Sequence, residues 1–405
     1  MRLFAKHEEE PNGVAVIVKG GAGTGKTILA VYLMKLFADI NRRADEKLTE
    51  DKYMDEDGET LGAAESLKSI KKIGIVFPQA TLKASIKDVF NSVKGLDAGM
   101  VYSQTELVDE YLRTGEKFDL LIVDEGHRLK CRYKGHLSSY PKFDQCTTKL
   151  GMKKEEGNEL DWILKCSRNQ IIFRDELQTI RPCDIDEKDF YSILKRNGKK
   201  VNRQELSVQW RCKGGNEYIN YIKGILNQSV TKKRSFDTYD FKLFGDVNMM
   251  IESIKTKDAE LGLCRNAAGY AWRWSSKNDK TAFDIEIHDH KYRWNSTYNN
   301  WIASRNSVNE IGCIHTLQGY DLNYVGLIIG EDIKFDEETQ QIYADKDCYF
   351  DQQGKSGVAN DPKALKEYLL NIYLTLMTRG IKGTYLYVCD DALRRYFAQF
   401  VDVVE

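Results

Sequence analysis

Long apolar runs are absent from this sequence of 405 residues. No stretch of about 18 apolar residues exists, which is the minimum for a helix that crosses a bilayer, so we predict no membrane partner. The first residues, MRLFAKHEEEPNG, lack the apolar centre of a signal peptide. The nine cysteines are odd in number and include no C-x-x-C pair, which argues against a disulfide framework. These absences favour a cytoplasmic protein with reduced thiols.

A strong excess of charge of one sign is also absent. The chain has 60 Lys and Arg residues against 61 Asp and Glu residues, for a net charge of −1. Overall charge therefore neither supports nor excludes a nucleic-acid partner. No cluster of metal ligands is evident either: His288 and His290 flank Asp289, which favours a strand face over a metal site because no further ligands stand nearby.

The stretch VAVIVKGGAGTGKTILAVYLMKLF, residues 14–37, organises the chain. Residues 14–18 predict a buried strand, and apolar residues at helical spacing run from Ile28 to Leu36. Between them is a phosphate-loop pattern, made of Gly20, Gly21, Ala22, Gly23, Thr24, Gly25, Lys26 and Thr27. In such a loop backbone N–H groups surround phosphate oxygens, so we expect Lys26 to reach the β- and γ-phosphates and Thr27 to bind Mg²⁺. The flanking strand and helix disfavour a glycine-rich turn without a ligand.

Two acids follow another predicted strand, residues 118–123. The carboxyl ends of parallel strands are where ligands bind in open α/β sheets. We therefore expect Asp124 to hold Mg²⁺ and Glu125 to act as the base that deprotonates the attacking water. Gln178 follows the next strand, residues 170–173, and could contact the γ-phosphate, although a solvated turn glutamine is the simpler interpretation.

Strand and helix patterns alternate through both halves of the chain, which predicts an α/β fold with doubly wound, mainly parallel sheets. We expect one domain over residues 1–200 and a second over 201–405, with an acidic insertion around 331–361. Further strands are predicted at 73–77, 261–264, 310–315, 324–330 and 383–389, and helices at 81–93, 206–226, 362–377 and 391–399. Polar composition predicts a solvated excursion at 41–69, a surface loop at 130–158 and a linker at 195–203.

The second half has no phosphate loop, so groups elsewhere would have to complete a nucleotide site. Arg211 and Arg379 are the candidates, because a planar guanidinium suits the dispersed charge of a transferring phosphoryl group. The alternative for either arginine is an ordinary surface residue.

Six segments, in chain order, resemble motifs one to six of superfamily 1 helicases: GGAGTGKT, LLIVDEGH, FRDELQ, LSVQWR, IHTLQGYDLNYVGLIIG and NIYLTLMTRG. The details are most similar to the Schlafen-type, group 3-like DNA/RNA helicase domain family, from about residue 14 to 397. This resemblance implies two RecA-like P-loop domains with ATP and Mg²⁺ in the interdomain cleft, and single-stranded DNA or RNA as partner.

The resemblance also implies a role for each motif residue. It places Lys26 and Thr27 on phosphate and Mg²⁺, Asp124 on Mg²⁺, Glu125 as base, Gln178 as γ-phosphate sensor, and Arg211 and Arg379 as trans-domain arginines. It makes Gln318 and Gly319 the residues that couple nucleotide state to nucleic acid, with Thr316 on the nucleic-acid backbone.

Three departures from the family pattern stand out. Gly126 replaces the commoner alanine of the second motif and is expected to loosen the turn. Arg174 stands where glycine often precedes the aspartate. No glutamine precedes the phosphate loop, which leaves base selectivity open. It also leaves open whether the chain is part of a longer protein, so a fused or associated N-terminal effector domain is a candidate partner.

Two functions fit these residues. The first is an ATP-dependent nucleic-acid motor or remodeller, and the alternative is an NTP-operated switch or defence-related regulatory ATPase that does not unwind nucleic acid. A small-molecule P-loop kinase fits poorly, because it would have no use for the paired arginines or HTLQG. Tryptophans at 272, 274, 294 and 301 could stack on bases, but core packing is the favoured interpretation.

Overall fold

The computed structural model describes most of the chain and divides it into two compact units. The described residues are 10–21, 23–45, 69–132, 140–175, 183–206, 212–297, 301–317, 320–355, 358 and 360–405. One unit comprises residues 1–21, 25–179 and 183–207, and the other comprises 22–24, 180–182 and 208–405. Five predicted site residues lie outside the described part, namely Ala22, Gln178, Arg211, Gln318 and Gly319.

The first unit is built on a parallel sheet of six strands in the order β3-β2-β4-β5-β1-β6. The strands are β1 (Val14–Gly20), β2 (Ile73–Val76), β3 (Val101–Tyr102), β4 (Phe118–Val123), β5 (Ser167–Arg174) and β6 (Lys200–Leu206). The phosphate-loop strand β1 pairs with both β5 and β6. The central strands are continuous apolar runs, as expected when helices cover both faces of a parallel sheet.

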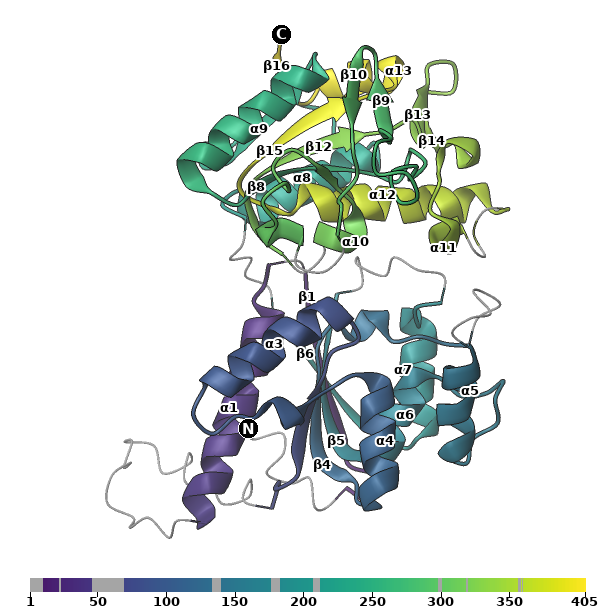
Figure 1. Ribbon diagram of the computed structural model, residues 1–405. Helices are drawn as coiled ribbons and strands as arrows, with labels where there is room; N and C mark the ends of the chain where they lie inside the picture. The colour runs from purple at the N-terminus through teal and green to yellow at the C-terminus, as the bar shows by residue number, and fades with distance from the viewer. Residues whose placement is uncertain are drawn as a thin grey trace. The chain divides into compact units, whose positions relative to one another are not determined.

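Helices cover the two faces of this sheet. Figure 1 shows α1 (Lys26–Asp45) and α3 (Ala80–Ser92) on one face and α4 (Gln104–Thr114), α6 (Glu159–Cys166) and α7 (Glu187–Arg196) on the other. Each face has its own buried core, with Met34, Phe37 and Phe90 in the first and Leu107, Trp162 and Phe190 in the second. This doubly wound arrangement holds the carboxyl ends of β1, β4 and β5 side by side.

The second unit contains another parallel sheet of six strands, in the order β11-β8-β12-β15-β7-β16. These are β7 (Asp240–Phe244), β8 (Cys264–Ala268), β11 (Ile311–Gly312), β12 (Leu322–Ile329), β15 (Gly380–Val388) and β16 (Asp402–Val404). Two antiparallel hairpins stand apart from it, β9 (Ile285–Ile287) with β10 (His290–Tyr292) and β13 (Ile333–Asp336) with β14 (Gln341–Ala344). The predicted α/β fold class with two mainly parallel sheets, one in each unit, is confirmed.

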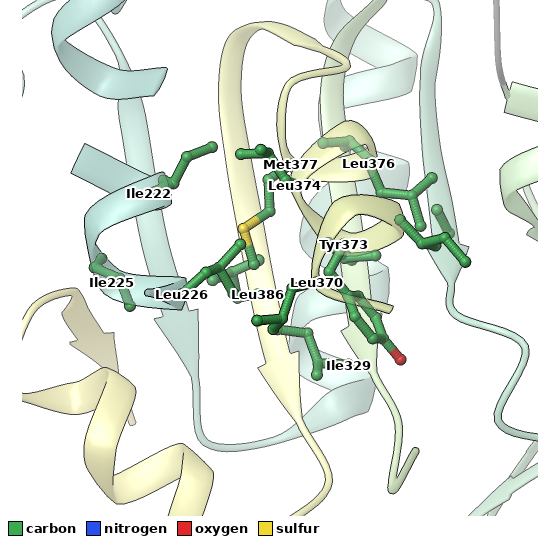
Figure 2. Close-up of a cluster of buried hydrophobic side chains, with 14 of the residues drawn as sticks. Ile222, Ile225, Leu226, Ile329, Leu370, Tyr373, Leu374, Leu376, Met377 and Leu386 are labelled. Carbon is green, nitrogen blue, oxygen red and sulfur yellow. The ribbon is translucent and has the colours of Figure 1, made fainter. Parts of the chain in front are cut away.

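Helix α12 (Pro362–Met377) is the centre of the second unit's main core. Figure 2 shows its side chains Leu370, Tyr373, Leu374 and Met377 packed among residues from neighbouring elements. Those neighbours belong to α8 (Gly215–Leu226), β12 and β15, and include Ile222, Ile225, Leu226, Ile329 and Leu386. The other face of the sheet carries α9 (Val247–Leu261), with α13 (Asp391–Ala398) on the side of α12. Burial of α12 fixes the position of its carboxyl end, which precedes Arg379.

Several sequence predictions of local structure are wrong. The predicted surface loop at 130–158 contains α5 (Tyr140–Lys149), whose Phe143 ring packs 4.6 Å from that of Trp162. The predicted linker at 195–203 is the end of α7 and the start of β6, an edge strand whose exposed side chains explain its polar composition.

The strand predicted at 261–264 lies at β8 instead, because Leu261 ends α9 and the next two residues form a turn with positive φ angles. The acidic segment 331–361 forms the β13–β14 hairpin and the short helix α11 (Gln352–Lys355). No described helix combines the length and the apolarity that a membrane span requires.

Candidate active site

The phosphate loop joins the carboxyl end of β1 to the first residue of α1. Gly23 and Gly25 both adopt a φ of +80°, a conformation that side chains rarely take. A Cβ at Gly25 would meet no atom within 4 Å, so the dihedral angle and not crowding requires glycine there. Helix α1 begins at Lys26 and has no acidic residue in its first turn. Its free N–H groups and positive end therefore favour an anion at this loop.

Lys26 is buried against its own loop. Its Nζ donates to the carbonyl oxygens of Gly20 at 2.7 Å and Gly21 at 2.8 Å. The same ammonium lies 3.5 Å from Oδ2 of Asp175, which follows β5. Only 6% of Lys26 is exposed, so its charge is held at the carboxyl edge of the sheet.

Thr27 and Asp124 are in direct contact. Thr27 Oγ1 donates to Asp124 Oδ2 at 2.5 Å, and Asp124 is fully buried at the end of β4. Burial, with the charge of Glu125 next, raises the pKa of Asp124 to about 7. Asp124 Oδ1 has no hydrogen-bond partner in the described part of the chain. A hydroxyl beside a buried carboxylate with an unused oxygen fits the oxygen ligands that Mg²⁺ prefers.

Glu125 adopts a φ of +51°, which is uncommon for a residue other than glycine and marks local strain. His127 Nε2 lies 3.2 Å and Arg128 Nε 3.6 Å from Glu125 Oε2. Burial, the largest influence, acts to raise the pKa of Glu125, but His127, Arg128 and Lys26 outweigh it and hold that pKa well below its ordinary value. The pKa values of the two adjacent acids thus differ in direction. Glu125 stays ionised, whereas Asp124 tends to hold a proton.

His127 links this turn to the next strand, a role that the sequence reasoning missed. Its Nδ1 accepts a hydrogen bond of 3.2 Å from the backbone N–H of Asp175. An accepting Nδ1 assigns the ring proton to Nε2, which lies 3.2 Å from Glu125 Oε2 but makes no hydrogen bond within the described residues. The signal available in the sequence was a histidine two residues after Glu125 together with an aspartate directly after the next strand.

The sequence predicted that Gly126 loosens the turn after β4, and this prediction is wrong. A Cβ at this position would lie 2.5 Å from Ile172 Cγ2 and 3.0 Å from the carbonyl oxygen of Phe173. The glycine instead allows the turn to approach β5 closely. Arg174, the second departure from the family pattern, is buried. Its guanidinium carbon lies 3.9 Å from the centre of the Phe190 ring, so the side chain packs against α7.

The residues after Glu125 pair with the chain that follows residues 176–182. Ile185 donates to the Leu129 carbonyl and Cys131 to the Cys183 carbonyl, each through its backbone N–H at 2.8 Å. Asp175 and Cys183, the two described anchors on either side of residues 176–182, are therefore both attached to the chain that follows Glu125.

In the second unit, Arg379 is only 1% exposed and follows the buried helix α12. The alternative that Arg379 is a surface residue is therefore wrong. Its carbonyl accepts from the Leu322 N–H at 3.1 Å, which ties this segment to the start of β12.

Thr316 lies in the short helix α10 (Ile314–Leu317) and is buried. Its hydroxyl donates to the Cys313 carbonyl at 2.9 Å and accepts from the Cys313 N–H at 3.0 Å. This hydroxyl is used within the helix turn, so the expected contact with a nucleic-acid backbone has no support from it.

Core packing of the tryptophans is confirmed. Trp294 and Trp301 are buried, and Trp301 Nε1 donates to Glu310 Oε2 at 2.7 Å. Trp272 and Trp274 pack against the same core as Trp294. Among the described residues no group of three or more His, Cys, Asp or Glu could hold a metal ion, and His288 lies in the turn between β9 and β10.

One protein family matches most of the chain. Residues 13–390 match the family described as Schlafen group 3, DNA/RNA helicase domain. The chain is 26% identical over 410 residues to the Saccharomyces cerevisiae protein named Uncharacterized protein YPL245W, covering 93% of this chain and 82% of that protein.

Two solved structures are also similar. One is the arterivirus nonstructural protein 10 helicase, with 12% identity and a TM-score of 0.37, covering 94% of this chain and 61% of that one. The other is unliganded Pif1 from Bacteroides sp, with 14% identity and a TM-score of 0.36, covering 95% of this chain and 91% of that one.

Proposed function

Because the chain belongs to the Schlafen group 3 DNA/RNA helicase domain family, we propose that it is an ATPase that moves along or remodels nucleic acid. The chain is a helicase-like P-loop NTPase. In this proposal it hydrolyses ATP to ADP and phosphate and acts on DNA or RNA. The single observation that best supports hydrolysis is the convergence of Lys26, Thr27, Asp124 and Glu125 at one edge of the first sheet.

The proposed chemistry assigns one task to each of these side chains. Lys26 exchanges its loop carbonyls for the β- and γ-phosphates of ATP, and the N–H groups of the loop bind the same oxygens. Thr27 and Asp124 would hold Mg²⁺, which would neutralise phosphate charge when bound. Glu125, kept ionised by its neighbours, accepts the proton of the attacking water. His127, whose Nε2 lies 3.2 Å from Glu125 Oε2, helps to keep that carboxylate ionised.

The remaining motif residues complete the proposal. Gln178 is assigned to sensing the γ-phosphate, and Arg211 and Arg379 to stabilising its charge in the transition state. Gln318 and Gly319 are assigned to coupling nucleotide state to a bound single strand. The roles of Gln178, Arg211, Gln318 and Gly319 rest on the family motifs alone, since these residues lie outside the described part of the chain.

The decisive experiment measures ATP turnover with and without a panel of single strands and duplexes of DNA and RNA. A motor or remodeller is expected to hydrolyse ATP faster when its strand is present. The matched negative control is Glu125→Gln under the same conditions. Nucleic-acid-independent turnover across the whole panel would favour the regulatory switch, and absence of turnover under every condition would contradict the ATPase itself.

Nucleic-acid binding provides a second test. Binding through backbone phosphates releases counterions, so affinity should fall steeply between about 50 and 200 mM salt. It should also change when a non-hydrolysable ATP analogue is present. A titration without binding at about 50 mM salt, with and without the analogue, would argue for the switch.

A further inference from the structure

A cavity of about 570 Å³ opens at the amino edge of the first sheet. Its wall includes Phe118 and Ser167, the first residues of β4 and β5, and Asn12, just before β1. In a parallel sheet this edge is opposite the one that carries Lys26 and Asp124. We name this cavity the amino-edge pocket, and it is separate from the candidate active site.

Four basic side chains contribute to its lining. They are Lys117, Lys165, Arg168 and Lys199, contributed by four different turns or element ends. The carboxylate in the lining, Asp119, is already engaged, because its Oδ2 accepts the backbone N–H groups of Lys71 at 2.9 Å and Lys72 at 2.8 Å. Within the described ranges, Lys117 and Lys165 make no ion pair. The described lining therefore brings four basic side chains together with one carboxylate.

Lys199 is held in the amino-edge pocket by two hydrogen bonds. Its Nζ donates to the backbone carbonyls of Asn12 and Arg168, both at 2.7 Å. An ammonium has three donors, so one remains for a ligand. Burial, followed by the neighbouring charges of Lys117 and Arg168, lowers the pKa of Lys199 to about 8. An anion in the pocket would relieve this repulsion and favour the charged ammonium.

We infer that the amino-edge pocket is a second phosphate-binding site, which takes a ligand bearing several phosphate groups. The lining favours phosphate over base recognition: its aromatic residue, Phe118, is only 1% exposed and offers no face for stacking. Point charges from flexible lysines suit the oxygens of a phosphate chain. Such a chain can come from a free polyphosphate or from the backbone of a nucleic acid, and both present the same oxygens.

The test measures binding of inorganic tripolyphosphate to the full chain without Mg²⁺, in a Lys26→Ala background that removes the phosphate-loop ammonium. The expected result is saturable binding that weakens at least tenfold in Lys117→Gln/Lys165→Gln. The matched control is Lys94→Gln/Lys188→Gln, two exposed lysines of the same unit outside the pocket, which should bind as the background does. Equal weakening in both double variants, or no binding at about 50 mM salt, would overturn the inference.

Folding does not confuse this test, because the substituted lysines are exposed and thermal unfolding of each variant can be compared. Affinity should also fall as the pH rises through about 8, where Lys199 loses its proton, and Lys199→Arg should remove that dependence. Competition identifies the source of the phosphates. A single-stranded oligonucleotide that displaces tripolyphosphate indicates a nucleic-acid backbone, and one that does not indicates a free polyphosphate.

The proposed ATPase can fail without affecting this result. Its measure is turnover, which depends on Lys26 and Glu125, whereas the amino-edge pocket is measured by binding in a chain that already lacks Lys26. Tripolyphosphate binding that persists in the Lys26→Ala background and disappears in Lys117→Gln/Lys165→Gln supports the pocket whether or not ATP is hydrolysed.

Discussion

At the residue scale, Glu125 is held ionised in a half-buried and strained position beside Asp124. Glu125→Gln should bind ATP with Mg²⁺ but hydrolyse it about 10² to 10⁴ times more slowly, because an amide cannot accept the proton of water. Steady-state turnover and nucleotide affinity measure the two effects separately. Glu116→Gln, on a 77% exposed side chain, is the matched control. Loss of nucleotide binding in a folded Glu125→Gln protein would make Glu125 a binding ligand instead.

Lys26 contributes the positive charge closest to the loop. Lys26→Ala should lose hydrolysis and most nucleotide affinity, because nothing else in the loop neutralises the β- and γ-phosphates. Isothermal titration with ATP and turnover assays are the measurements, with Lys94→Ala as control. Unchanged turnover in the purified variant would show that this loop is not the catalytic site.

Asp332 is a buried acid outside the candidate site. It follows β12, accepts a hydrogen bond from the Tyr373 hydroxyl, and burial raises its pKa to about 7. The folded state therefore binds more protons than the unfolded state between about pH 4 and 7, so stability should fall as the pH rises through this range, by up to about 1.4 kcal/mol per pH unit. Above about pH 7 this contribution is constant.

Asp332→Asn imitates the protonated acid and should remove that slope. Urea unfolding at pH 5, 6, 7 and 8 measures it, and the variant is expected to gain most over the parent at pH 8. Asp109→Asn, at an exposed position, controls for the change of charge. Parallel pH profiles in the parent and Asp332→Asn would contradict the assignment.

At the element scale, Gly126 sets how closely the turn after β4 approaches β5. Gly126→Ala should destabilise the chain by about 1 to 3 kcal/mol, because the new Cβ would overlap Ile172 Cγ2. Ile172→Ala removes that methyl group. Gly126→Ala should therefore lower the free energy of unfolding less in the Ile172→Ala background than in the parent. Gly245→Ala is the control, since its Cβ would meet only an oxygen at 3.7 Å. Urea unfolding gives all four values.

Sequence patterns predicted the bounds of elements that have a clear apolar run or clear end signals. Helix α12 was predicted at its observed bounds, because Asp361 caps it, Pro362 starts it, and apolar residues fill it. Strand β4 was likewise predicted at its observed bounds from its apolar run. The edge strand β6 was missed because an edge strand needs no apolar alternation, and its pairing with β1 is visible only in three dimensions.

In the candidate site, too, local sequence predicted some features, whereas others depend on contacts between distant residues. The motif positions of Lys26, Thr27, Asp124 and Glu125 could be predicted because strand ends and a glycine loop dictate them. The contact between His127 and Asp175 could not, since it joins residues 48 positions apart through one backbone hydrogen bond. The close approach at Gly126 was likewise hidden, because its cause is a side chain on a neighbouring strand.

At the scale of the whole molecule, the proposal requires the second unit to supply charge for hydrolysis. Arg379→Ala and Arg211→Ala should each lower turnover by on the order of 10³ while ATP affinity changes little. Arg379 is buried, so Arg379→Lys, which keeps the charge without the planar fork, is the companion variant, and thermal unfolding is measured on all three. Near-normal turnover in both alanine variants would mean that the second unit does not complete the site.

The two anchors around residues 176–182 have a consequence for sequence variation. Asp175 and Cys183 are both attached to the chain that follows β4. Each contact uses a backbone group of Asp175 or Cys183, so substitution of these two side chains leaves it in place, whereas loss of the His127 ring removes the contact to Asp175.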